Sequence, residues 1–352
     1  MMSRHIRVGF IGAGGIAGTH IGYLKKIDGV SITALADPNR ENIEKRVKDH
    51  GLGDAKIYED YRRMLEEAEV DAVSICTPNW LHYEPTIAAL EAGKHVMVEK
   101  PLAMNVREGR RMCEAAKKSG KVFSIGFQQR FRADVQYARR LALEGRLGKF
   151  LYARAHALRR RGIPSWGVFG QKKLQGGGPM IDIGVHILDM ALFIMGMPRP
   201  VSAAGCCYTY LGNRKPATTA PWGDWDYKTY TVEDLAAGFV RFKDGSSLTV
   251  EASFAAHIEK DVFAVTIMGT EGGVYVGDEG LRFFTDLDGK MVNTVPAFLG
   301  NVDAFGRKME AWIEAIRGAE NPSPGEDGLI IQSILDGIYE SAEKGREIAI
   351  KV

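Results

Sequence analysis

Three ionisable residues lie close together in a segment that is otherwise apolar. Asp182, His186 and Asp189 are four and three residues apart within the run 181–195. On an α-helix this spacing places all three on one face, and their apolar neighbours predict a helix buried on nearly every side. Buried ionisable groups need a partner or a chemical purpose. His186, whose imidazole titrates near neutral pH, is the natural general base for removing a hydroxyl proton.

A further reactive group, Lys100, comes from an earlier part of the chain. Glu99-Lys100-Pro101 follows a predicted strand, and open α/β sheets bind ligands at the carboxyl ends of their strands. An ammonium group there can stabilise charge on a reacting oxygen. Asp182 is expected to orient the substrate hydroxyl or to bias the protonation of His186. We therefore identify Lys100, Asp182 and His186 as candidate catalytic residues for hydride transfer at an alcohol carbon.

Other interpretations of these residues remain open. Asp182 and His186 are also consistent with a buried polar pair whose hydrogen bonds are satisfied within the fold. Two residues four apart on a helix can bind a metal together, but no third or fourth ligand stands out in the sequence and we predict no metal. An isolated lysine such as Lys100 is more often a surface charge.

Dinucleotide binding is predicted by a glycine-rich turn. The run 12–17, Gly-Ala-Gly-Gly-Ile-Ala, ends the first predicted strand and opens a helix. Gly12 permits the tight turn, Gly14 allows close approach of a pyrophosphate, and the helix start at Gly15 and Ile16 offers N–H groups to the phosphates. Asp37 ends the second strand, where a carboxylate binds the adenosine ribose and repels a 2′-phosphate, so NAD(H) is predicted rather than NADP. The alternative for Asp37 is a helix cap.

These residues require strands that end at one edge of a sheet. Up to residue 127, short apolar strands alternate with helices, which predicts a parallel, doubly wound α/β domain over 1–127. From 128 to 352 the pattern predicts an α+β domain with a large, mostly antiparallel sheet, a helix over 181–195 and closing helices over 303–317 and 329–344. Its expected strands are 150–160, 201–210, 235–242, 247–256, 262–269 and 273–276.

The composition excludes several classes of protein. With 45% hydrophobic and 26% charged residues and a net charge of +2, the 352-residue chain shows no bias toward nucleic acid or an anionic membrane. The sequence has no uninterrupted apolar run of about 18 residues, so no transmembrane helix is predicted. The N-terminus lacks the apolar segment and cleavage site of a secretory signal, so we expect a cytoplasmic protein.

The combined motifs resemble the glucose–fructose oxidoreductase / inositol dehydrogenase / rhizopine catabolism (Gfo/Idh/MocA) family. The resemblance covers essentially the whole chain. It is carried by the glycine turn, Asp37, Thr77-Pro78-Asn79 with His82, Glu99-Lys100-Pro101, and the run 176–189. It implies a Rossmann domain followed by a substrate-binding domain, bound NAD(H), and a homodimer or homotetramer assembled through the second sheet. It also implies the catalytic roles given above to Lys100, Asp182 and His186.

The resemblance adds contacts to the cofactor. It places the loop with Thr77, Asn79 and His82 beside the nicotinamide ribose, although His82 is equally typical of a helix start. Glu99, next to the candidate lysine, and Gln128, after the last strand of the first domain, complete the predicted set.

Two further residues are candidate substrate contacts. His156 lies on a predicted strand, and the pattern leaves open which face of the sheet it occupies. Trp166 precedes the glycines at 176–178, and its ring is of a kind that stacks on a sugar. The glycines themselves would let the backbone run close to a ligand.

The predicted function is an NAD(H)-dependent oxidoreductase acting on a hydroxyl of a small sugar, cyclitol or glycoside. One alternative is a glycosidase that uses NAD for transient oxidation followed by elimination, with no net NADH. Another is a non-catalytic dinucleotide-binding regulator, which is disfavoured because Lys100, Asp182 and His186 are all present.

Overall fold

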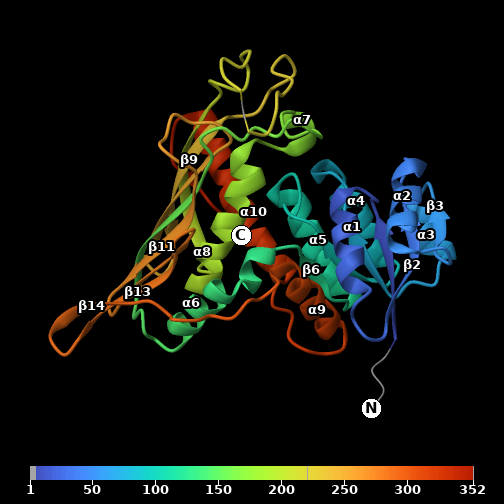
Figure 1. Ribbon diagram of the computed structural model, residues 1–352, viewed down its shortest axis with the longest axis horizontal. Coiled ribbons are helices and arrows are strands. Elements are labelled where there is room, and N and C mark those ends of the chain that lie inside the picture. The colour runs from blue at the N-terminus through green and yellow to red at the C-terminus, as the bar shows by residue number, and fades with distance from the viewer. Residues whose placement is uncertain (1–4, 220, 352) are drawn as a thin grey trace. The chain divides into compact units, whose positions relative to one another are not determined.

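The computed structural model describes residues 5–219 and 221–351, and the chain divides into two compact units (Figure 1). Unit 1 takes in the chain up to Gln128 together with Asp303–Leu329. Unit 2 takes in Gln129–Val302 and the chain from Ile330 onward. The segment 303–329, which the sequence analysis assigned to the second domain, therefore packs in unit 1.

Unit 1 contains a six-stranded parallel sheet in the order β3-β2-β1-β4-β5-β6. The strand order reverses between β1 and β4, the place where doubly wound sheets bind their ligands. This arrangement confirms the predicted α/β fold. The strands are β1 (Ile6–Ile11), β2 (Val30–Ala36), β3 (Lys56–Tyr58), β4 (Ala72–Ile75), β5 (His95–Val98) and β6 (Phe123–Ile125).

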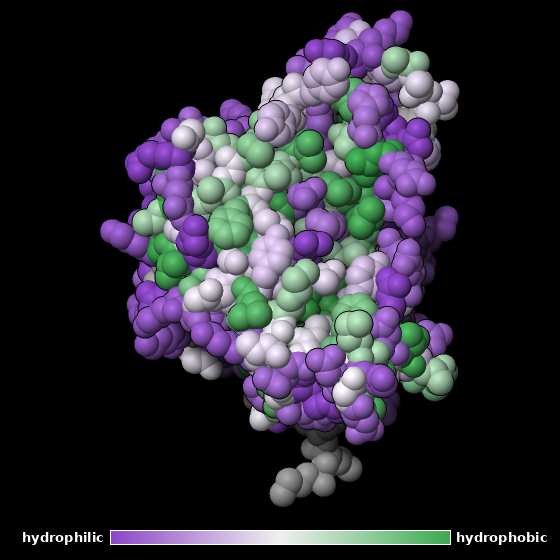
Figure 2. All heavy atoms as spheres, turned by 90° about the vertical axis from the view of Figure 1, so that its left-hand side faces the viewer, coloured by the Kyte–Doolittle hydropathy of each residue, from purple (hydrophilic) through white to green (hydrophobic). Residues whose placement is uncertain are grey.

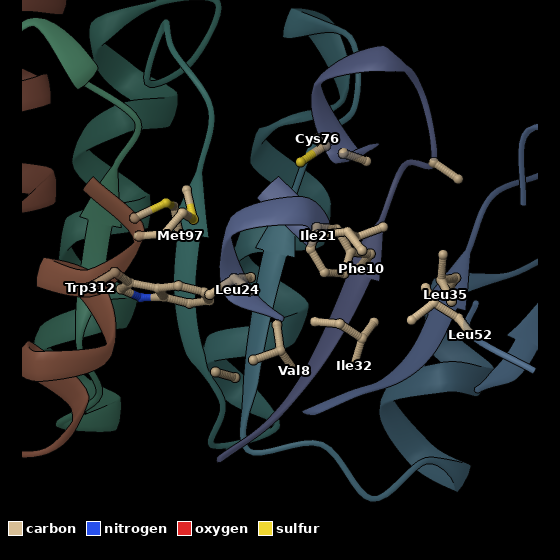
Figure 3. Packing of buried hydrophobic residues seen from close by; sticks show 14 of the residues in the cluster. Val8, Phe10, Ile21, Leu24, Ile32, Leu35, Leu52, Cys76, Met97 and Trp312 are labelled. Carbon is tan, nitrogen blue, oxygen red and sulfur yellow. The ribbon is translucent and has the colours of Figure 1, made fainter. Parts of the chain in front are cut away.

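Helices cover the sheet of unit 1 and close its core. Figure 3 shows Phe10 of β1 packed near Ile21 and Leu24 of the first helix, with Trp312 of a helix from the end of the chain beside them. Trp312 is only 1% exposed, which explains why the segment 303–329 belongs to this unit. The helices are α1 (Gly15–Leu24), α2 (Arg40–His50), α3 (Tyr61–Glu67), α4 (Tyr83–Glu91), α5 (Val106–Ser119) and α9 (Ala304–Ile316).

Unit 2 contains a nine-stranded sheet in the order β14-β13-β12-β11-β7-β10-β9-β8-β15. Neighbouring strands are antiparallel except for β7 and β10, as the sequence analysis predicted for this region. The last three strands in the chain were not predicted. The strands are β7 (Phe150–Leu158), β8 (Pro200–Tyr208), β9 (Leu235–Phe242), β10 (Ser247–Ser253), β11 (Val262–Gly269), β12 (Gly273–Gly277), β13 (Gly280–Leu287), β14 (Lys290–Thr294) and β15 (Ile348–Ala349).

One face of this sheet is covered by helices. Ala153, Ala155 and Ala157 of β7 are buried against them, while the residues between them point to the other face. Figure 2 shows that other face, where hydrophobic and intermediate side chains predominate inside a hydrophilic rim. The helical segments are α6 (Ala133–Leu143), α7 (Lys172–Gln175), a π-helical turn η3 (Met180–Gly184), α8 (Val185–Met195) and most of α10 (Gly325–Lys344).

The segment Lys172–Met195 is long and apolar enough to cross a membrane by length and composition alone. However, 89% of its most apolar window is buried inside the protein. We therefore interpret it as a buried core segment of unit 2; for its part 181–195 the sequence analysis predicted a helix buried on nearly every side.

Candidate functional site

The glycine turn of unit 1 has the geometry of a phosphate cradle. Gly12 has a φ of +86°, and a Cβ there would lie 2.7 Å from the backbone of Cys76, so a side chain does not fit. By contrast, a Cβ on Gly14 or Gly15 would have no described atom within 4 Å. Gly14 begins α1 without a side-chain cap. These glycines leave room beside the start of α1, whose first N–H groups have no acceptor within the helix and suit the pyrophosphate of a dinucleotide.

Asp37 is linked directly to this turn. Its carboxylate accepts hydrogen bonds from the backbone N–H of Ala13 at 2.7 Å and of Asn39 at 2.8 Å. The helix-capping role considered for Asp37 falls to Asn39, whose side chain accepts from the N–H of Glu41. A carboxylate has about four acceptor positions, so Asp37 keeps capacity for ribose hydroxyls.

The loop after β4 is joined to the loop after β5 by His82. This residue is 1% exposed; its Nδ1 lies 2.7 Å from the carbonyl oxygen of Pro101, and its Nε2 lies 3.0 Å from that of Thr77. Burial lowers the pKa of His82, and a neutral ring donates to one carbonyl at a time. His82 thus holds the Thr77 loop against the segment that follows Lys100. Asn79 begins the short helix η1 (Asn79–Leu81) and is buried.

Glu99 lies at the centre of a buried charged cluster in unit 1. Its Oε1 accepts a hydrogen bond from Lys308 Nζ at 2.8 Å and lies 2.9 Å from His20 Nε2. Burial by itself would raise the pKa of Glu99, but the Lys308 ammonium and the His20 ring hold it well below its ordinary value. The backbone N–H of Lys100 contacts Glu99 Oε2 at 3.3 Å. The cluster therefore supports the strand end that presents Lys100, whose side chain is half-buried.

Sequence reasoning missed two members of this cluster, His20 and Lys308. Burial and the nearby Lys308 charge lower the pKa of His20 to about 4, so the ring is neutral at physiological pH. Its Nδ1 lies 2.9 Å from Ser74 Oγ. Lys308 falls on the buried face of α9, next to Met309. A charge within an apolar helix face was the signal that would have identified it.

The predicted cofactor residues gather at one edge of the sheet. The glycine turn follows β1, Asp37 follows β2, the Thr77 loop follows β4, and Glu99 with Lys100 follows β5. Gln128 follows β6 at the start of the short helix η2 (Gln128–Phe131), and its N–H donates to the Gly126 carbonyl at 3.2 Å. Strands β2, β1, β4, β5 and β6 are adjacent and parallel, so their carboxyl ends form a continuous edge.

In unit 2 the predicted reactive helix begins differently from expectation. Asp182 lies in the π-helical turn η3, and His186 lies in the first turn of α8. The expectation of one regular α-helix over 181–195 is therefore wrong, and the four-residue spacing of this pair crosses a change of helix type. Asp182 is 7% exposed and His186 is half-buried. Single π-helical turns frequently occur at functional sites.

Asp189 forms a buried ion pair that supports α8. Its Oδ1 accepts a hydrogen bond from Arg130 Nε at 2.7 Å, and both side chains are about 1% exposed. The ion pair fixes α8 against η2 within unit 2.

Two of the glycines before the π turn lie close to other groups of the protein. A Cβ on Gly177 would overlap Tyr339, and one on Gly178 would overlap the backbone of Glu233. The Glu233 carboxylate accepts hydrogen bonds from the N–H of Gly178 at 2.8 Å and of Met180 at 3.2 Å, and from Tyr339 Oη at 2.7 Å. Burial raises the pKa of Glu233. These contacts hold the backbone that leads into Asp182.

The two candidate substrate contacts occupy different places in unit 2. His156 alternates with the buried Ala155 and Ala157, so it points to the sheet face opposite α8, where its Nε2 lies 3.7 Å from Glu251 Oε1. The structure therefore separates His156 from Asp182, which argues against a contact with the same substrate. Trp166 lies in an open loop and is 56% exposed. Among the residues that the structure describes, no three His, Cys, Asp or Glu side chains gather as a metal site.

Comparison with known proteins agrees with this geometry. Residues 6–127 match the model of an oxidoreductase family with an NAD-binding Rossmann fold, and residues 135–275 match the GFO/IDH/MocA C-terminal domain. The chain is 36% identical to D-glucoside 3-dehydrogenase of Escherichia coli over 99% of both chains. It is 26% identical to scyllo-inositol 2-dehydrogenase (NAD(+)) of Bacillus subtilis, covering 91% of this chain and 89% of that protein.

A solved structure is similar over the whole length. Levoglucosan dehydrogenase in complex with NADH and levoglucosan superposes with a TM-score of 0.83 and 26% identity, covering 99% of this chain and 100% of that one. The chain therefore belongs to the GFO/IDH/MocA family of oxidoreductases, and its unit 1 contains an NAD-binding Rossmann fold.

Proposed function

We propose that this chain oxidises a ring hydroxyl of a glucoside, or of a closely related sugar or cyclitol, with NAD as the hydride acceptor. The observation that carries the proposal is the 36% identity to D-glucoside 3-dehydrogenase over 99% of the chain. The presence of Lys100, Asp182 and His186 in the segments described above supports it. Levoglucosan dehydrogenase, an enzyme named for an anhydrosugar, is also similar over the whole length.

Each candidate residue has one role in this proposal. Bound NAD would supply the acceptor for the hydride that leaves the alcohol carbon. His186 removes the hydroxyl proton as a general base. Lys100 donates a hydrogen bond to the same oxygen and stabilises its developing negative charge. Asp182 orients the hydroxyl, and the Glu233 contacts that fix η3 hold it in place.

We further propose that Asp37 makes the enzyme prefer NAD to NADP. Its carboxylate, anchored by the N–H of Ala13, is positioned to accept ribose hydroxyls and to repel a 2′-phosphate. The cofactor contacts are proposed to include Thr77, Asn79, Gln128 and the N–H groups at Gly14–Ile16. The test is the ratio of kcat/KM for the two cofactors; equal or greater efficiency with NADP would refute the preference.

The main experiment is NADH formation across a panel of methyl glucosides, levoglucosan, inositols and free sugars. The highest kcat/KM is expected with a glucoside. His186→Ala should lower turnover roughly 10²- to 10⁴-fold, the usual contribution of a general base, and leave NAD affinity nearly unchanged. His5→Ala, which changes an exposed histidine bonded to Ser31, is the matched control. Near-normal turnover of His186→Ala would refute its role, and glycoside cleavage without net NADH would favour the glycosidase alternative.

The outer face of the sheet in unit 2 is proposed to pair with a second copy of the chain, giving a homodimer or homotetramer. Half-buried apolar, aromatic and hydroxyl side chains occupy its centre, including Tyr152, Phe239, Thr249 and Tyr275, and Figure 2 shows a hydrophilic rim around them. Sedimentation is expected to show an oligomer, and Phe239→Asp is expected to dissociate it. A strict monomer at working concentration would overturn this proposal of an oligomer.

We also propose a cytoplasmic location.

A further inference from the structure

Unit 2 contains a cavity outside the residues assigned so far. It has a volume of about 790 Å³, within the range of roughly 300–1,000 Å³ that is common for ligand sites. Its wall combines an indole ring with planar or hydroxyl hydrogen-bonding groups: Trp222, Arg160, Arg161, Thr218, His257 and Asp261. All of these residues belong to unit 2.

The ring in the cavity wall is held by two loops that are distant in sequence. Trp222 stacks on Trp166, with ring centroids 5.5 Å apart and ring planes 27° apart. Ser165 Oγ donates a hydrogen bond to the Trp222 carbonyl at 2.7 Å. Nevertheless Trp166 is 56% and Trp222 is 37% exposed. Two fixed aromatic rings that stay accessible are typical of a surface that binds a ligand.

Arg159 connects this cavity with the candidate catalytic helix. Its guanidinium lies 4.1 Å from the centre of the Trp222 ring. Burial lowers the pKa of Arg159, and the carboxylates of Asp182 and Asp261 act in the opposite direction. The turn η3, which carries Asp182, packs on the same strand end: a Cβ on Gly184 would lie 3.2 Å from Ala252, which pairs with Ala157 of β7, two residues before Arg159. The two sites are neighbours within one unit.

We propose that the cavity is a second carbohydrate subsite, which binds a neutral sugar ring joined by a glycosidic bond to the ring that is oxidised. This inference rests on the proposed function and deepens it: the substrate is a glycoside of at least two rings. Trp166 and the Arg159 guanidinium already contact the Trp222 ring, so the parts of the Trp222 and Trp166 rings that stay exposed offer their apolar surface to the C–H groups of a sugar. Hydroxyl groups need both donors and acceptors, which Arg161 and Asp261 supply.

The wall favours a neutral ring over an anionic group. Asp261 brings a negative charge into the cavity. Moreover, the guanidinium groups are partly engaged: Arg160 Nη1 donates to the Glu259 carbonyl at 2.9 Å, and Arg161 Nη1 donates to the Ala256 carbonyl at 3.0 Å. A phosphate or carboxylate ligand would meet the Asp261 carboxylate and would find these donors only in part available.

The test compares substrates with one ring and with two. Using the full-length protein and NAD, kcat/KM is measured for methyl glucoside, maltose and cellobiose. Trp222→Ala is expected to raise KM for the preferred disaccharide about tenfold, equivalent to about 1.4 kcal/mol, with less than about a twofold change for methyl glucoside. Trp222→Phe should restore most of the loss. Phe298→Ala, which removes an aromatic ring that is 86% exposed in the same unit, is the matched control and should leave KM unchanged for both substrates.

A binding measurement separates this inference from the proposed function. Calorimetric titration of the same disaccharide needs no turnover, and Trp166→Ala provides a second variant if Trp222→Ala fails to fold. If no sugar is oxidised but the disaccharide binds, and binding weakens in the Trp222 or Trp166 variant, the proposed function fails and the subsite stands. Three results would each overturn the proposed subsite. The first is an equal loss of kcat/KM for one-ring and two-ring substrates, and the second is unchanged disaccharide affinity in these variants. The third is displacement of the disaccharide by inorganic phosphate.

Discussion

Two buried glutamates support the two halves of the candidate chemistry, and their surroundings differ. Glu99 in unit 1 is 8% exposed and contacts the Lys308 ammonium, whereas Glu233 in unit 2 is 6% exposed and accepts hydrogen bonds from the N–H groups of Gly178 and Met180 and from Tyr339 Oη. The pKa of Glu99 lies well below its ordinary value, whereas that of Glu233 is raised. Each glutamate holds the backbone beside a proposed catalytic residue, Lys100 or Asp182.

The difference shows that the nature of the partner, not the degree of burial, decides the protonation of a buried carboxyl group. Burial raises the pKa of both glutamates, because a low-dielectric environment disfavours the charged form. A full positive charge at 2.8 Å reverses this effect for Glu99. Neutral hydrogen-bond donors lower the pKa of Glu233 only partly, so burial prevails.

The largest effect is expected from Lys308→Met. The change leaves Glu99 buried without its cation, and removing one member of a buried ion pair typically costs about 3–5 kcal/mol. The free energy of unfolding, measured with urea at neutral pH, should fall by that amount. Lys308→Met combined with Glu99→Gln should recover part of the loss, because no unpaired charge remains.

The pH dependence of the same variant tests the cause. In the wild type the lowered pKa of Glu99 gives stability that is present above the ordinary value of 4.5 and is lost as the pH falls through the lower folded value. In Lys308→Met burial should raise the pKa instead, so stability should be lost as the pH rises. A variant that is as stable as the wild type, or that follows the wild-type pH profile, would contradict the proposed role of the ammonium.

The second effect concerns the neutral partners of Glu233. Glu233→Ala removes the acceptor for the N–H groups of Gly178 and Met180 and for Tyr339 Oη. Leaving buried donors unsatisfied costs about 1–3 kcal/mol, so the loss should be smaller than for Lys308→Met. Because η3 carries Asp182, turnover should also fall while NAD affinity, measured by calorimetry, stays unchanged. A loss of NAD affinity would show that the effect is not confined to unit 2.

The sequence predicted those features whose physical cause is local. Gly12, Asp37 and Lys100 could be identified because a strand, a turn and a helix start adjoin in the chain. Lys308 could not be placed beside Glu99, because 209 residues separate them and only packing joins them. The π turn at Asp182 was missed for a related reason: its backbone is bound by Glu233, about 50 residues later. Strand β14 was missed because its residues are mostly exposed and lack an apolar pattern.

A smaller effect is expected from Tyr339→Phe. The change removes one hydrogen bond to Glu233, that of Tyr339 Oη at 2.7 Å, and keeps the ring that packs beside Gly177. A single hydrogen bond contributes about 0.5–1.5 kcal/mol, so urea unfolding should show a loss in this range. Because that hydrogen bond lowers the pKa of Glu233, its removal should raise this pKa further. A loss as large as that of Glu233→Ala would mean that the phenol has another role.

The sharpest contrast in pH dependence between the two glutamates is expected from Glu233→Gln. The side-chain amide keeps a carbonyl oxygen for the Gly178 N–H and never carries a charge. The raised pKa of wild-type Glu233 means that its stability is fully present below the ordinary value of 4.5 and is lost as the pH rises through the folded value. The glutamine variant lacks this loss.

Urea unfolding of both proteins between about pH 4 and about pH 8 therefore distinguishes the two environments. At the acid end Glu233→Gln should lie about 1–3 kcal/mol below the wild type, because its NH2 group cannot accept a hydrogen bond from the Met180 N–H. As the pH rises, the free energy of unfolding of the wild type should fall relative to that of the variant, and the difference should then become constant. Glu99→Gln should show the opposite trend, because its carboxylate is stabilised as an anion by Lys308. If both substitutions moved stability in the same direction with pH, the partner would not be what sets the charge of these two carboxyl groups.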